Sequence, residues 1–99
     1  MNVISKHGLV KLLKGKSRDV QSEVLAWYRV ARKADWASFA DVRSHFSDAD
    51  LVGELLVFNI RQNRYRLVVF PVFSRARLYV KALLSHKEYD REAWKTKWP

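Results

Sequence analysis

The chain has 99 residues, of which 48% are hydrophobic and 13% aromatic, so it can bury its own core and is expected to form a single domain over residues 1–99. It contains no cysteine, which excludes a disulfide framework and zinc sites built from thiolates. Its formal net charge of +9 favours a polyanionic partner, first of all nucleic acid. The segment from Arg61 to Lys87 has basic residues and no Asp or Glu.

The N-terminal segment, Met1 to Lys6, lacks the long apolar run of a signal peptide, and no segment reaches the roughly 18 apolar residues of a membrane span. A cytoplasmic protein without a membrane partner is therefore expected. His7 and His45 match no metal-ligand spacing, so we expect neither a metal nor another cofactor.

Hydrophobic periodicity predicts helices in the first half of the chain and strands in the second. The expected order is a brief strand over 2–4, helices over 6–14, 18–34 and 39–46, strands over 54–60, 64–73 and 78–84, and a terminal helix from 86 to about 95. Residues 47–50 are expected to form a polar loop. This β-α-α-(α)-β-β-β-α order predicts an α+β fold, with N-terminal helices packed on one face of a largely antiparallel sheet.

Period-two alternation along the two long strands separates a core face from a solvent face. It assigns Leu67 and Val69, and in the next strand Ala82 and Leu84, to the side of the helices. The residues expected on the solvent face are Arg64, Arg66, Tyr79 and Lys81.

A hairpin closed over residues 74–77 would pair Phe73 with Leu78 and Arg66 with Ser85, so that Arg66 would lie next to His86. A shift of one residue would place Arg66 opposite Leu84. Pro71 cannot donate to the ladder and indicates a bulge or an unpaired position. A bulge between Arg66 and the hairpin would shift the expected register by one.

Several segments resemble the HigB-type toxins of the wider RelE/ParE superfamily, and together they cover most of the chain. They are Ala26-Trp27-Tyr28, Ala34-Asp35-Trp36, Phe58-Asn59-Ile60, Asn63-Arg64-Tyr65-Arg66-Leu67, Tyr79-Val80-Lys81 and Ser85-His86-Lys87-Glu88-Tyr89-Asp90. The resemblance implies a small RelE-like fold and the toxin of a type II toxin–antitoxin system. Such a toxin cleaves mRNA on the translating ribosome, and its partners are mRNA, the ribosome and a HigA-like antitoxin.

The resemblance also suggests roles for individual residues. An arginine of RelE-like relatives maps onto Arg66, and their basic residues and tyrosine match Lys87 and Tyr89 loosely, whereas His86 belongs to the HigB-type motif. Two departures stand out. Arg61-Gln62 replace an expected glycine-rich loop, and Lys81 replaces an expected arginine, which keeps the charge but loses bidentate phosphate contact.

Metal-independent RNA cleavage requires deprotonation of the 2′-hydroxyl, neutralisation of the phosphorane charge and protonation of the leaving 5′-oxygen. We assign Arg66 and Lys81 to the phosphate, and His86 to proton transfer as either base or acid. Tyr89 is either the orienting group or the second proton carrier. Further RNA contacts are expected from Arg61, Arg64, Arg75, Arg77 and Lys87.

Each assignment has a structural alternative. His86 could cap the last helix, Tyr89 could pack its ring, and the arginines could form a solvated face. Trp94 and Trp98 could stack on bases or pack in the core. The protein as a whole could instead be a basic binding toxin without enzymatic activity, such as a ParE-like topoisomerase inhibitor, or an RNA-binding module that does not cleave.

Overall fold

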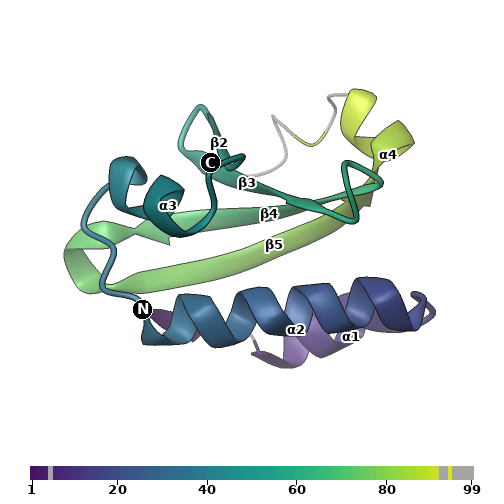
Figure 1. The fold of residues 1–99 in the computed structure, drawn as a ribbon, viewed down its shortest axis with the longest axis horizontal. Coiled ribbons are helices and arrows are strands. Elements are labelled where there is room, and N and C mark those ends of the chain that lie inside the picture. The colour runs from purple at the N-terminus through teal and green to yellow at the C-terminus, as the bar shows by residue number, and fades with distance from the viewer. Residues whose placement is uncertain (5, 92–93, 95–99) are drawn as a thin grey trace.

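The computed structural model describes residues 1–4, 6–91 and 94, which form an α+β fold of four α-helices and a five-stranded sheet (Figure 1). The strands are β1 (Asn2–Ile4), β2 (Asp50–Val52), β3 (Leu55–Ile60), β4 (Tyr65–Val72) and β5 (Arg77–Ser85), and the helices are α1 (Lys6–Leu13), α2 (Arg18–Lys33), α3 (Phe39–His45) and α4 (His86–Asp90). The predicted fold class is confirmed. β2 was not predicted, because its three residues adjoin a run of polar ones.

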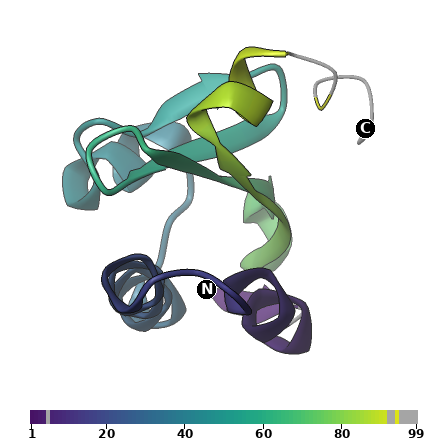
Figure 2. The ribbon, with the colours of Figure 1, turned by 90° about the vertical axis from the view of Figure 1, so that its right-hand side faces the viewer.

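The sheet has the strand order β1-β5-β4-β3-β2, and only the β1–β5 pair is parallel. Helices α1 and α2 lie side by side beneath the sheet, whereas α4 lies on the opposite side (Figure 2). The terminal helix was predicted to reach about residue 95, but α4 ends at Asp90. Residues 92–93 and 95–99, which include Trp98, lie outside the described part of the chain.

Helix α2 combines an apolar stripe at helical spacing with stabilising groups at both of its ends. The Ser17 hydroxyl accepts a hydrogen bond from the Val20 amide at 3.4 Å, which satisfies one of the free N–H groups of the first turn. Arg32 and Lys33 occupy the last turn, where cations interact favourably with the helix dipole. The buried residues of α2 lie three or four positions apart, at helical spacing: Val20, Val24, Trp27 and Ala31.

The main core lies between these helices and the sheet, and Phe58 of β3 is its aromatic centre. The ring centroid of Phe58 lies 5.3 Å from that of Trp27 on α2 and 5.2 Å from that of Phe46, which follows α3. Both pairs are edge-on, the geometry that aromatic quadrupoles favour. Trp36 completes the cluster at 6.4 Å from Phe58. The sheet is thereby fixed to α2 and to the segments on both sides of α3.

The register of β4 and β5 differs from the predicted one. Arg66 lies opposite Leu84, not Ser85. Val68 pairs with Ala82 while Val69 pairs with Val80, so Lys81 is an extra residue on β5, in a β-bulge. Because the bulge reverses the alternation beyond Lys81, Ala82 and Leu84 lie on the face away from α1 and α2, contrary to the prediction. That face carries a second, smaller apolar cluster: Leu55, Val57, Val68, Ala82 and Trp94, with Val52, Phe70, Leu84 and Tyr89 packed against it.

Pro71 does not itself cause the bulge, because it pairs in register with Leu78. The β3–β4 ladder covers β4 only from Tyr65 to Val69, so at Pro71 the strand pairs with β5 alone. A proline is tolerated at such a position because one side of the strand has no ladder to break.

Candidate functional site

The predicted site residues divide between two ends of the sheet. The start of β4, the end of β5 and α4 meet at one end, where Arg64, Arg66, His86 and Tyr89 are found (Figure 1). Arg75, in the turn before β5, and Arg77, the first residue of β5, lie at the other end, roughly 26 Å away along the strand. The structure therefore does not bring these two arginines to His86.

Arg66 is held by contacts from three elements. Its neighbours across the sheet are Asn59 on β3 and Leu84 on β5. Its guanidinium carbon lies 5.0 Å from the ring centroid of Tyr89 on α4, within cation–π range. Its Nη1 atom is buried and has no hydrogen-bond partner among the described residues. A charged donor without a partner is costly, so this atom marks a place where an anion would be stabilised.

Tyr89 itself is held by Trp94. The two rings are stacked with centroids 4.9 Å apart and planes 24° apart, and the Trp94 indole donates a hydrogen bond to the Tyr89 carbonyl at 2.9 Å. Trp94 is only 4% exposed. It therefore packs against the sheet, and it does not offer a face for base stacking.

His86 lies at the first turn of α4 but does not cap the helix. Ser85 is the cap: its hydroxyl accepts from the Glu88 amide at 3.2 Å, and the Glu88 carboxylate accepts from the Ser85 amide at 2.9 Å. The His86 amide extends the ladder by donating to the Arg64 carbonyl at 2.9 Å. The imidazole is exposed, with Nε2 3.1 Å from a carboxylate oxygen of Asp90. It is thus accessible to a substrate and oriented by an acidic neighbour.

The reciprocal capping hydrogen bonds affect the titration of Glu88 in acid. The hydrogen bond from the Ser85 amide, followed by the one that links Glu88 to the Ser85 side chain, lowers the pKa of Glu88 below its ordinary value of 4.5. The bond from the Ser85 amide to the carboxylate is complete above the ordinary pKa and is lost as the pH falls through the lowered one. We expect the Ser85 amide proton, followed by NMR between pH 7 and 2, to move upfield with a midpoint below 4.5. A Glu88→Gln variant should show no such transition, and an unlowered midpoint in the wild type would contradict the capping geometry.

Lys81, the bulged residue, lies midway between the two ends. Its Nζ is 5.7 Å from the ring centroid of Tyr79. Bulges commonly redirect a side chain next to a functional site. Here the extra residue, Lys81, adds a cation to β5, the strand on which Leu84 lies opposite Arg66.

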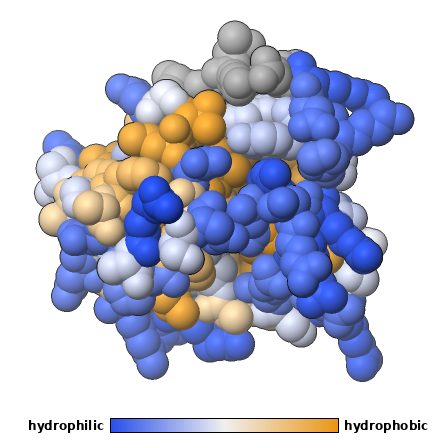
Figure 3. All heavy atoms as spheres, turned by 45° about the horizontal axis from the view of Figure 1, so that its top comes forward, coloured by the Kyte–Doolittle hydropathy of each residue, from blue (hydrophilic) through white to orange (hydrophobic). Residues whose placement is uncertain are grey.

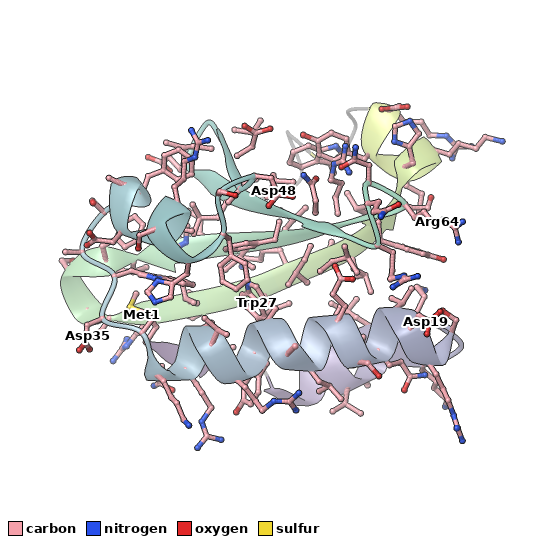
Figure 4. All side chains as sticks on the ribbon, in the orientation of Figure 1. Met1, Asp19, Trp27, Asp35, Asp48 and Arg64 are labelled. Atoms are coloured by element: carbon pink, nitrogen blue, oxygen red, sulfur yellow. The ribbon has the colours of Figure 1, made fainter. Side chains whose placement is uncertain are left out.

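The β3–β4 loop holds Arg61 against α2. The Arg61 amide donates to Glu23 at 2.9 Å, and its guanidinium lies 3.7 Å from Asp19, at the start of α2 (Figure 4). Arg61, Gln62 and Asn63 all have positive φ, of 52°, 53° and 80°. The loop thus adopts the left-handed conformations that glycine would adopt at lower cost, and the contacts with α2 offset that cost. Arg64 and Lys87, by contrast, are exposed and have no ion pair among the described residues.

Asn59 is a neighbour of Arg66 that was not among the predicted site residues. Its amide donates to the Asp48 carboxylate at 3.1 Å. Asn59 follows Leu55 and Val57 at intervals of two residues along β3, so all three side chains share a face. That face carries the second apolar cluster and Arg66. The signal was therefore present in the sequence.

In the described part of the chain, no group of three or more histidine or acidic residues could hold a metal ion. Among the same residues, no helix has the length and hydropathy needed to span a bilayer.

Comparison with known proteins gives one result that covers most of the chain. A model of the HigB toxin family, described as the RelE-like toxic component of a toxin–antitoxin system, matches residues 20–92. This range includes all the predicted catalytic and RNA-binding residues, which lie between Arg61 and Tyr89. No curated protein matches the chain.

Proposed function

The chain belongs to the HigB toxin family, the RelE-like toxic components of toxin–antitoxin systems, and from that premise we propose that it is a ribosome-dependent mRNA endonuclease. In this proposal it inhibits translation in the cytoplasm by cleaving RNA without a metal. Membership in the family implies an antitoxin as a partner. The mRNA and the ribosome are the partners that the proposed activity adds.

The observation that carries the proposal is the unpartnered Nη1 of Arg66. The strands on either side of Arg66, β3 and β5, contain no Asp or Glu, so neither offers it a carboxylate. The guanidinium lies against the Tyr89 ring, and no hydrogen bond to a described residue occupies its Nη1 donor. A rigid guanidinium with free donors is suited to the planar recognition of a phosphate.

The remaining residues supply the other requirements of the reaction. In the proposed mechanism His86 transfers a proton to or from the reacting hydroxyls, and Arg66 and Lys81 stabilise the charge that develops on the phosphorane. The stacking of Tyr89 between Arg66 and Trp94 favours an orienting role for its ring over a role as proton carrier. Arg64 and Lys87 contact flanking phosphates, and Arg61 does so if it leaves Asp19.

Induction of the protein in growing cells tests the proposal, with primer extension on cellular mRNA as the measurement. Wild type should produce cuts in phase with translated codons. Arg29→Ala removes one exposed charge from α2 and should cut like the wild type. Growth arrest with intact mRNA would overturn the proposal in favour of a topoisomerase inhibitor or another non-cleaving toxin, and cutting of purified RNA without ribosomes would overturn its ribosome dependence.

Replacement of His86 separates proton transfer from binding. General acid–base groups contribute about 10²–10⁴-fold, so His86→Ala should lower the cleavage rate on ribosomes by a factor in that range while leaving ribosome affinity unchanged. Asp90→Asn keeps the imidazole and loses only its charged neighbour, so its effect should be much smaller. Single-turnover cleavage and ribosome pelleting measure the two quantities. Full activity of His86→Ala would exclude it as the proton-transfer group.

A further inference from the structure

Two aromatic residues, Phe70 and Tyr79, are cross-strand partners on the face of the sheet that carries Arg66. They are paired in the β4–β5 ladder, so their side chains share a face. Phe70 lies four residues along β4 from Arg66, which places both on the same side. Phe70 packs at the border of the second apolar cluster, and both rings are half-buried. Each ring therefore keeps part of its surface open.

These two rings differ from the other aromatic residues of this face. Tyr89 and Trp94 are stacked on one another, and Tyr89 also carries the guanidinium of Arg66. In the described residues no aromatic ring stacks on Phe70 or Tyr79, and the group found over Tyr79 is the ammonium of Lys81. A planar ligand could therefore reach the open part of the Phe70 ring, and would meet Tyr79 beside or in place of the Lys81 ammonium.

A hollow adjoins Phe70 between the turn that follows β2 and the end of β4. Its volume is about 400 Å³, and it is lined by Leu51, Gly53, Glu54 and residues 70–73. Leu51 is 47% exposed at its rim. The volume is within the range of sites that hold small organic groups. Figure 3, in which the top of Figure 1 comes forward, shows a mostly hydrophilic surface with an apolar patch.

The charges around the two rings indicate which class of ligand this surface would bind. Lys81 and Arg77 flank Tyr79 along β5, and Arg75 precedes them in the turn, whereas Glu54 is the one acid in the lining of the hollow. Aromatic faces interleaved with cations are typical of surfaces that stack bases and neutralise the phosphates between them. An acidic peptide would use the cations but would leave the ring faces without planar partners.

We propose that Phe70 and Tyr79 form a base-stacking subsite for single-stranded RNA, which continues the path of the strand from Arg66 toward Arg77. This inference rests on the proposed function, because it takes RNA as the ligand. Four residues of β4 separate Phe70 from Arg66 by about 13 Å, a distance that a few nucleotides of extended strand cover. The bulged Lys81 lies between them and meets an intervening phosphate.

Binding of an uncleavable RNA tests the subsite apart from catalysis. The probe is a fluorescent 2′-O-methyl hexanucleotide, whose blocked 2′-oxygen prevents cleavage, titrated at low ionic strength with wild type, Phe70→Leu and Tyr79→Leu. Because each ring is expected to stack on one base, the loss of either ring should raise the Kd for the probe about tenfold. Replacing one base of the probe by an abasic site should weaken wild-type binding similarly, and that loss should vanish in the Phe70→Leu variant.

Tyr65→Leu is the matched control, because Tyr65 is also a half-buried aromatic residue of β4 but packs against the main core on the other face. It should bind the probe as the wild type does. Unchanged affinity in both Phe70→Leu and Tyr79→Leu would overturn the subsite, whatever the cleavage assays show. Weakened binding of the antitoxin with unchanged RNA binding would also overturn it. If the wild type binds the probe as expected but never cuts mRNA, the proposed function fails and the subsite stands.

Discussion

Replacing Arg66 by alanine should lower the cleavage rate on ribosomes by about 10²–10³-fold, the loss found when one preorganised donor to a developing charge is removed. The free energy of unfolding, in contrast, should change little. The substitution removes a buried donor that has no partner, and the cation–π interaction with Tyr89 contributes only about 0.5–2 kcal/mol. Single-turnover cleavage and urea unfolding measure the two effects.

Three further variants show what Arg66 does. Arg66→Lys keeps the charge and loses the planar fork, so it should recover only part of the rate. Tyr89→Phe keeps the ring under the guanidinium and should remain active, whereas Tyr89→Leu removes the ring and should resemble a partial loss of Arg66. An inactive Tyr89→Phe would show that the hydroxyl transfers a proton, and an active Arg66→Ala would remove the phosphate role of Arg66.

Replacing Phe58 by alanine should have the largest effect on folding. Phe58 is 2% exposed and contacts Trp27, Trp36 and Phe46, so its removal leaves a cavity that these rings cannot close. Such substitutions cost about 3–5 kcal/mol. A domain of this size has about 5–15 kcal/mol of stability, and each kcal/mol moves Tm by roughly 4–8 °C. Urea and thermal unfolding measure the loss.

Phe58→Leu is the control, since it retains most of the buried volume and should lose much less stability than the alanine variant. Phe39→Ala adds a second comparison, because Phe39 is only half-buried at the edge of the same core. Equal losses in Phe58→Ala and Phe39→Ala would show that the aromatic cluster is not the centre of the core.

Features that depend on near neighbours in the chain could be predicted from the amino-acid sequence. The stripe of α2 follows from apolar residues at helical spacing, and the cap at its start, Ser17, lies only three residues before Val20. The alternation of β4 placed Leu67 and Val69 in the main core and Arg66 on the other face. The fold class and the basic character of this sheet followed from the same local patterns.

The pairing of β4 with β5, in contrast, depends on contacts between distant segments and could not be predicted from either strand. The run Ala82-Leu83-Leu84 is apolar at every position, so its alternation does not reveal which residues face the helices. A bulge is a property of two strands, set by the packing on both faces, and a single strand carries no sign of Lys81 as the extra residue. That one residue places Arg66 opposite Leu84. The proximity of Arg66 to Tyr89 then depends on α4, which Trp94 holds against the same face.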